Sequence, residues 1–438
     1  MTNSKWSRLL ATASVVAVFA AACGDDEKEP ADTSAAITTA PPAEDVVEAA
    51  PTCTGTADGK LVIGELLPET GSLAFLGPPE FAGAQLAAND VNAAGGVLGA
   101  DLELLGGDSG DTSTDTATQT VNGHIEAGAD AVLGAASSGV SMTVIDAITG
   151  ACKIHFSPAN TSPDFTEYAD DDLYFRTAPS DVLQGRVLSD LMHEEGNETA
   201  AIMALQDPYG EGLLKYTSEP FTAAGGEVLA SITYDPNATT FDAEVDEVVA
   251  ADADAIVIIG FAETSKILTT LFDKGVTADT KKIYLVDGNI GNALGEEFAD
   301  PGVLSGIAGT LPAAETGEDF KARLLEVDPE LIDFSYAPET YDAVIIMALA
   351  AEVAGSDDAA QVAAHINGVT RGGTVCTTYA DCKALVADGT DIDYDGPSGP
   401  QSFGPAGEPT EASFMILRYG EGSNSIDDSL TVFKFAKI

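Results

Sequence analysis

Short apolar runs alternate with longer amphipathic stretches from Lys60 to about residue 290, and this alternation restricts the possible folds more than any other feature of the sequence. The runs of strand length lie at 61–66, 101–106, 130–134, 153–157, 173–177, 200–205, 227–234, 255–260 and 282–287. The helix candidates lie at 78–94, 113–128, 139–149, 180–196, 211–224, 241–251 and 262–275. Continuous apolar strands are typical of a parallel sheet buried on both faces, and the alternation indicates βαβ units with right-handed crossovers.

The number of strand candidates exceeds what one open sheet usually holds, so we predict an α/β fold with two doubly wound parallel-sheet lobes. Ligands of such folds bind beyond the C-terminal ends of the strands. Two facing lobes would therefore place both sets of strand ends around one ligand cleft. After residue 290 the pattern loosens, and it predicts helices at 337–354 and 356–368 and strands with turns at 411–437.

The charge balance excludes several classes of partner. The 438 residues include 19 Lys and Arg and 71 Asp and Glu, a formal net charge of −52. A field this negative repels phosphates, so we expect neither nucleic-acid binding nor electrostatic docking on anionic lipid. Hydrophobic residues make up 45% of the chain, which is enough to build a core.

The N-terminus has the pattern of an export signal. Lys5 and Arg8 precede an apolar run, 9–22, that is too short to span a membrane. Small residues then lead into Cys23, which resembles the acylated Cys of a bacterial lipoprotein. We therefore expect a signal peptide at 1–22, an acidic and Pro-rich tether at 23–53, and a lipid anchor on the extracytoplasmic face of the cell membrane. The alternative is ordinary signal-peptidase cleavage after Ala22 and a soluble secreted protein.

The remaining cysteines fit an oxidising compartment. If Cys23 carries lipid, an even number remains, and this favours disulfides. Cys376 and Cys382 are close in sequence and would form a local bridge. Cys53 and Cys152 would then pair by elimination, with free buried thiols as the alternative.

Catalytic and metal-binding signatures are missing from the sequence. It contains no Walker loop, HExxH or CxxC pattern, and its four His residues show no ligand spacing. We therefore expect no metal site, no cofactor and no enzymatic activity. A hydrolase acting through Ser138 or Glu263 is the enzymatic alternative, and the lack of a His partner for a Ser nucleophile counts against it.

Several segments, in order, resemble the solute-binding proteins of ABC importers, specifically the leucine/isoleucine/valine-binding type. They are Gly64-Glu65-Leu66-Leu67-Pro68-Glu69-Thr70-Gly71, Glu80-Phe81-Ala82-Gly83-Ala84, Asp90-Val91-Asn92-Ala93-Ala94-Gly95-Gly96-Val97-Leu98-Gly99, Val132-Leu133-Gly134 with Ser137-Ser138, Phe156-Ser157-Pro158-Ala159-Asn160-Thr161-Ser162-Pro163, Phe175-Arg176-Thr177, Asp207-Pro208-Tyr209-Gly210-Glu211-Gly212 and Glu263-Thr264-Ser265-Lys266-Ile267-Leu268. The resemblance covers most of the mature chain. It implies two lobes that are joined by three crossover strands and close around a small solute. We place the first lobe at 54–178 and 292–392 and the second at 179–291 and 393–438.

The resemblance also implies how an α-amino acid would be held. Ser138 and nearby backbone N–H groups, including those beside Ser137, would bind the carboxylate. The Ala159 carbonyl, the Thr161 hydroxyl and Glu263 would bind the ammonium. Tyr209 and Leu76 would also line the cleft. Leu76 stands where the family commonly has an aromatic side chain. Because an unpaired buried charge is very costly, a zwitterion needs such matched partners.

Each of these residues also has a structural alternative. Ser138 would cap the helix that follows it, and Thr161 would stabilise its turn. The negative charge of Glu263 would stabilise the N-terminus of the next helix. Tyr209 would pack beside Gly210. The position of Arg176 near the hinge favours a structural role for this residue.

We therefore predict a lipid-anchored monomer that captures an amino acid, with the branched-chain type favoured, by cleft closure and delivers it to an ABC permease. The alternative is a sensor for amides or small acids.

Overall fold

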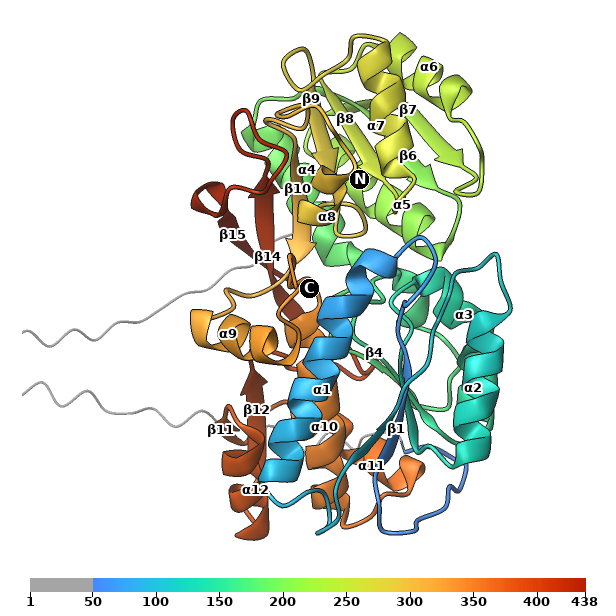
Figure 1. Ribbon diagram of the computed structural model, residues 1–438, viewed down its shortest axis with the longest axis vertical. Coiled ribbons are helices and arrows are strands. Elements are labelled where there is room, and N and C mark those ends of the chain that lie inside the picture. The colour runs from blue at the N-terminus through green and yellow to red at the C-terminus, as the bar shows by residue number, and fades with distance from the viewer. Residues whose placement is uncertain (1–49) are drawn as a thin grey trace, which may run out of the picture. The chain divides into compact units, whose positions relative to one another are not determined.

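The computed structural model describes residues 50–438, and two parallel-stranded sheets organise them (Figure 1). The first sheet has the order β2-β1-β3-β4-β5 and is parallel throughout. Its strands are β1 (Val62–Leu66), β2 (Glu103–Leu105), β3 (Ala131–Gly134), β4 (Ile154–Ser157) and β5 (Tyr174–Arg176). The predicted α/β class with parallel sheets is confirmed.

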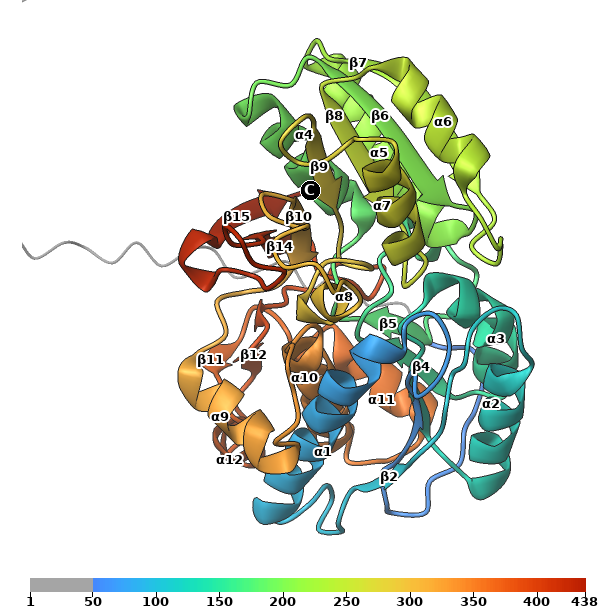
Figure 2. The same cartoon turned by 45° about the horizontal axis from the view of Figure 1, so that its top comes forward.

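Helices cover both faces of this sheet (Figures 1 and 2). One face carries α2 (Thr116–Ala127) and α3 (Ser138–Gly150), and the other carries α1 (Gly77–Ala93), α10 (Ala337–Ala354) and α11 (Ala359–Ile366). The strand residues divide between these two cores by alternation, since Val132 packs on the α2–α3 side and Leu133 on the α1–α10 side. Helices α1 and α10 approach closely at Gly83, where a Cβ atom would lie 2.4 Å from the Ala337 carbonyl oxygen.

The second sheet has the order β15-β14-β10-β9-β8-β6-β7. Its strands are β6 (Thr199–Leu205), β7 (Glu227–Tyr234), β8 (Ala255–Ile259), β9 (Lys282–Leu285), β10 (Ala308–Pro312), β14 (Glu411–Arg418) and β15 (Val432–Lys437). Strands β6 to β10 run parallel, and β14 and β15 add an antiparallel edge. Its helices are α4 (Asp181–Glu194), α5 (Pro208–Ala223), α6 (Asp242–Ala251), α7 (Thr264–Asp273) and α8 (Asn292–Glu296).

A small third sheet lies beside the first lobe and has the order β11-β12-β13. It is formed by β11 (Thr374–Cys376), β12 (Ile392–Gly396) and β13 (Gly399–Pro400), near α9 (Glu318–Val327) and α12 (Tyr379–Ala387). Three short 3₁₀ helices complete the described elements: η1 (Ala74–Leu76), η2 (Pro163–Phe165) and η3 (Asp428–Leu430).

The chain passes between the two large sheets at 177–180, 313–317 and 401–410. Two of these crossings come later than the lobe boundaries that we expected at 291/292 and 392/393. Strand β10 belongs to the second sheet, and β12 pairs with β11 and β13. The sequence did not indicate β10 (AGTLP), because this segment contains no apolar run; its pairing partners on either side hold it in the sheet.

Two disulfides join the predicted cysteines, Cys53 to Cys152 and Cys376 to Cys382. The first fastens the start of the described chain to the segment between α3 and β4. Cys23, the signal peptide and most of the tether lie outside the described residues. Within 50–438, no helix combines the length and the apolar character that crossing a membrane requires.

Candidate functional site

The C-terminal ends of the strands in both large sheets carry the polar residues that the sequence analysis singled out. In the first lobe, Ser138 follows β3, and Thr161 follows β4. In the second lobe, Tyr209 follows β6, and Glu263 follows β8. This is the edge where open parallel sheets bind ligands.

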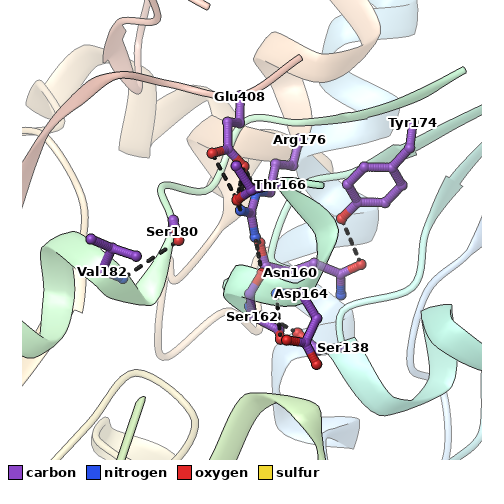
Figure 3. Close-up of polar contacts among 10 residues, drawn as sticks. All are labelled: Ser138, Asn160, Ser162, Asp164, Thr166, Tyr174, Arg176, Ser180, Val182 and Glu408. Atoms are coloured by element: carbon purple, nitrogen blue, oxygen red, sulfur yellow. Dashed lines mark hydrogen bonds and ion pairs between the residues drawn. The ribbon is translucent and has the colours of Figure 1, made fainter. Parts of the chain in front are cut away.

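The first-lobe loops are fixed by hydrogen bonds (Figure 3). The Ser137 hydroxyl caps α3 by accepting from the Val140 N–H at 3.3 Å, while the Ser138 hydroxyl accepts from the Ser162 N–H at 3.3 Å. The Asn160 amide donates to the carbonyls of 135 and 136, both at 2.9 Å. Ser138 and Thr161, which are both buried, therefore belong to one connected pair of loops.

Arg176 holds the same loop to the third crossing (Figure 3). Its side chain is 0% exposed, and its guanidinium pairs with Glu408 and donates to the carbonyls of Asn160, at 3.1 Å, and Ser162, at 2.7 Å. The Thr166 hydroxyl also donates to Glu408 at 3.0 Å. These contacts give Arg176 the structural role near the hinge that its position favoured.

The lobes touch on two sides of the site. The Ser162 hydroxyl donates to the Pro208 carbonyl at 2.9 Å, and the Ala262 N–H donates to the Ser72 carbonyl at 3.3 Å. First-lobe residues also join the apolar core of the second lobe, namely Leu73, Leu76, Ala136 and Ala159. Leu76 and Ala159 are thus buried at the interface between the lobes. The arrangement is that of a shut cleft.

Asp287, two residues beyond β9, is the most fully hydrogen-bonded acid at the site. Its carboxylate accepts from the hydroxyls of Tyr209, at 2.8 Å, and Tyr336, at 2.7 Å, and from the Gln184 amide at 2.8 Å. Burial raises the pKa of Asp287, and the three donors oppose this rise. Tyr209 also stacks on Phe261, with ring centroids 5.4 Å apart. Tyr209 therefore connects Asp287 to Phe261.

Asp181, the first residue of α4, differs from Asp287 because its carboxylate lacks such hydrogen bonds. It is 0% exposed, and neither of its carboxylate oxygens accepts a hydrogen bond from the described residues. Burial, followed by the charge of the neighbouring Asp287, raises the pKa of Asp181 well above its usual range, while the nearby Thr161 hydroxyl and the charge of Arg176 oppose this rise. Its backbone N–H donates to the Thr161 carbonyl at 2.8 Å, which places it beside the predicted ammonium site. A buried carboxyl group without a partner is costly unless a cation or a proton joins it.

Glu263 is 6% exposed and is held from one side only. Its Oε1 accepts from the Tyr234 hydroxyl at 2.8 Å and from the Phe261 N–H at 2.9 Å. Burial raises the pKa of Glu263. The pKa of the nearby Asp207 is raised to about 7, mainly by burial, and the charge of Glu263 adds to the rise.

A cavity of about 560 Å³ opens beside Glu263. Both lobes line it, and the second lobe also supplies its charged residues. The lining comprises Gly71, Ser72, Ala74, Phe75, Pro236, Phe261, Ala262, Glu263, Ser265, Lys266, Asn289, Ile290, Gly291, Ala293, Leu294, Glu296 and Glu297. Of the predicted binding residues, the lining includes Glu263 but not Ser138, Ala159 or Thr161. Glu263 is therefore the predicted ammonium partner that faces this cavity.

Sequence reasoning missed Asp181, Asp287, Tyr336 and Phe261. Asp287 was included in a strand candidate, although its position after an apolar run at the ligand edge was a usable signal. Asp181 has the sequence pattern of an ordinary helix start, and only tertiary packing buries it. Within residues 50–438, no group of three or more His, Cys, Asp or Glu side chains is arranged to hold a metal ion.

Comparisons with known proteins agree with this fold. The sequence pattern of the family described as periplasmic binding protein matches residues 60–422. Leu/Ile/Val-binding protein homolog 1 of Brucella abortus (strain 2308) is 26% identical over 317 residues, which are 70% of this chain and 82% of that protein. The chemotactic signal transduction system substrate-binding protein BasB of Halobacterium salinarum is 24% identical over 364 residues, which are 80% of this chain and 84% of that protein.

Solved structures share the fold. The substrate-binding protein LivJ of a branched-chain amino acid transporter from Streptococcus pneumoniae, in complex with isoleucine, has a TM-score of 0.70 at 23% identity and covers 86% of this chain and 100% of its own. A solute-binding protein from R. palustris in complex with 4-hydroxybenzoate has a TM-score of 0.68 at 15% identity, covering 84% and 95%.

Proposed function

Because this chain belongs to the periplasmic binding protein family, we propose that it captures an amino acid between its two lobes and delivers it to an ABC permease. We further propose that Cys23 carries a lipid that anchors the protein to the extracytoplasmic face of the membrane. The named relatives are binding proteins rather than enzymes, and the shut cleft suits capture and release of an unchanged solute.

The observation that carries the proposal is the buried carboxyl group of Asp181. A solute ammonium beside Thr161 would supply a direct ion-pair partner for Asp181, whose carboxylate forms none with the described residues. The Ala159 carbonyl would accept a second ammonium hydrogen, and the Ser138 hydroxyl with adjacent N–H groups would bind the solute carboxylate. Glu263 would offer its Oε2 to the ammonium, because Oε1 already accepts two hydrogen bonds on the second-lobe side.

Closure of the cleft would follow from the same contacts. Thr161 and Ala159 belong to the first lobe, whereas Asp287 and Tyr209 belong to the second. An ammonium near Asp181 would be fully stabilised only when Asp287 and Tyr209 are brought against the first-lobe loops. The solute would therefore bind the shut state more tightly than the open state, which is the condition for driving closure.

The test is the variant Asp181→Asn, which keeps the size of the side chain and removes its charge. We expect a loss of amino acid affinity of about tenfold or more, as for a charge-assisted hydrogen bond. Titration calorimetry with leucine, isoleucine and valine would measure it, preceded by a thermal-shift screen. Asp190→Asn, an exposed substitution on the same helix, is the matched control. The proposal fails if no amino acid raises the melting temperature of the wild type.

A sensor is the second candidate, because one relative is named as part of a chemotactic signalling system. Both candidates require solute binding and closure, so they differ only in the partner. Uptake of labelled solute by proteoliposomes that contain the permease would support transport. Solute-dependent binding to a receptor without uptake would support sensing.

A further inference from the structure

We infer that strand β15 pairs with β15 of a second copy of this chain, so that two second lobes form a symmetric dimer. Among the described residues, β15 pairs with β14 on one side and with no strand on the other, at the rim of the second lobe (Figures 1 and 2). An open sheet edge can add a strand from another chain. The inference concerns assembly, and it differs from the monomer that the sequence analysis predicted.

Exposed apolar side chains are concentrated on and beside this strand. Of the ten exposed large apolar side chains among residues 50–438, five lie between residues 430 and 438. They are Leu430, Val432, Phe433, Phe435 and Ile438. The side chain of Phe435 has the highest exposed fraction of the ten, 66%. An apolar patch of this kind is unfavourable in water, so a partner that covers it is stabilised.

The charge of the same segment allows the partner to be a second copy. The chain has a formal net charge of −52, so two copies repel each other over most of their surfaces. Residues 430–438 contain no Asp or Glu. Their two lysines, Lys434 and Lys437, are paired with Glu194 and Glu411 of their own chain. The segment is therefore a place where two copies can meet without strong repulsion.

The backbone of β15 is oriented for such pairing. The Ile438 N–H donates to the Thr410 carbonyl at 3.1 Å, so Ile438 faces the β14 side. Because the direction of N–H and C=O groups alternates along a strand, every second residue before it directs these groups away from β14. The outward residues are Phe433, Phe435 and Lys437. The Arg186 guanidinium reaches the Lys437 carbonyl at 2.9 Å, and a carbonyl oxygen can accept a second hydrogen bond.

A twofold axis at Phe435 brings these outward groups together. In this antiparallel register Phe435 lies opposite its own equivalent, Phe433 lies opposite Lys437, and Val432 lies opposite Ile438. The central pair exchanges two backbone hydrogen bonds, and its aromatic rings come into contact. No lysine lies opposite a lysine, whereas an axis at Lys434 would place two like charges together. The strand is thus complementary to itself in one register.

The expected interface is of modest size. A fully buried aromatic side chain covers ~150–250 Å², so the exposed parts of the patch on both copies bring the buried area to roughly 1,000 Å² in total. This is the lower end for a specific interface, and the dimer should therefore depend on protein concentration. No residue of β15 lines the cavity beside Glu263, so the dimer leaves that cavity accessible.

Sedimentation velocity on the full chain with Cys23→Ser, which prevents acylation, should show a monomer–dimer equilibrium. Phe435→Asp places two carboxylates opposite each other at the twofold axis and should weaken the dimer at least about tenfold. Leu229→Asp is the matched control, because Leu229 is an exposed apolar residue of β7, the opposite edge of the same sheet. It should leave the dimer unchanged, and solute affinity should be unchanged in both variants.

A cysteine cross-link tests the register. Opposed residues of a hydrogen-bonded antiparallel pair have Cα atoms about 5.5 Å apart, which a disulfide can span. The four cysteines of the described residues are already joined in two disulfides. In the Cys23→Ser background, Phe435→Cys should therefore give a covalent dimer under mild oxidation, whereas Leu229→Cys should not.

The opposite results would overturn the inference. A chain that stays monomeric at every concentration excludes the dimer, and protection of the β15 amides from hydrogen exchange in that monomer would show that another segment of the same chain covers the strand. A dimer that survives Phe435→Asp but is lost in Leu229→Asp would place the interface at β7. Each of these results leaves the proposed solute binding untouched, since calorimetry measures that separately.

Discussion

Glu339 is fully buried in the first turn of α10, and its Oε2 accepts no hydrogen bond from the described residues. Burial raises the pKa of Glu339 from 4.5 to about 8, and the neighbouring Asp342 adds to the rise. Glu80 on α1 faces it, and burial together with the charge of Glu339 raises the pKa of Glu80 well above its usual range. Asp342, whose pKa burial raises to about 7, is instead held by Tyr394 and Ser398. These acids favour a protonated folded state.

The first prediction concerns the pH dependence of stability. Between about pH 4.5 and 8, folded Glu339 keeps a proton that the unfolded chain loses, so stability falls as pH rises through this window. Glu339→Gln stays neutral, and its melting temperature at pH 8 should exceed that of the wild type by roughly 2–4 °C. Thermal denaturation followed by circular dichroism from pH 5 to 9 would measure this. Parallel pH profiles for wild type and variant would contradict it; the exposed Glu326→Gln is the control.

At the scale of elements, the start of α3 separates capping from binding. The two adjacent serines have different partners. The Ser137 hydroxyl caps α3 by accepting from the Val140 N–H, whereas the Ser138 hydroxyl accepts from the Ser162 N–H of the other loop. We predict that Ser137→Ala lowers the free energy of unfolding by about 1 kcal/mol and leaves solute affinity unchanged. Ser138→Ala should weaken solute binding about tenfold, since it would remove the donor that we propose for the solute carboxylate. Urea denaturation and calorimetry on both variants would test this. Equal affinity losses would show that both residues act through the helix start.

The elements that sequence reasoning could predict are those with a local signal. Apolar runs identify β1, β6 and β8, and the helices between them follow from their amphipathic pattern. Strand β10 could not be found this way, because Gly309 and Pro312 are poor strand residues and only its neighbours define it. The same limit applies to the site. Ser138 and Thr161 follow recognisable strands, but the burial of Asp181 depends on the first crossing and on Asp287 from a distant strand.

At the scale of the whole molecule, the third crossing is connected to the first-lobe loop that carries Thr161. The third crossing contributes Glu408, which pairs with Arg176 at the end of β5. Arg176 in turn holds the carbonyls of Asn160 and Ser162, in the loop that carries Thr161. Ser162 also contacts the second lobe through Pro208. One buried guanidinium thus connects the third crossing to the loop that carries Thr161.

This arrangement predicts that stability and affinity respond differently to two variants. Arg176→Met leaves Glu408 buried without its cation and should destabilise the protein by about 3–5 kcal/mol. Adding Glu408→Leu removes the unpaired charge, so the double variant should recover most of that loss, since apolar replacement of a buried pair is often neutral. Neither variant restores donors to the Asn160 and Ser162 carbonyls, so solute affinity should remain reduced in both. Urea denaturation and calorimetry would measure the two quantities. Recovery of affinity together with stability would show that Arg176 serves only to neutralise Glu408.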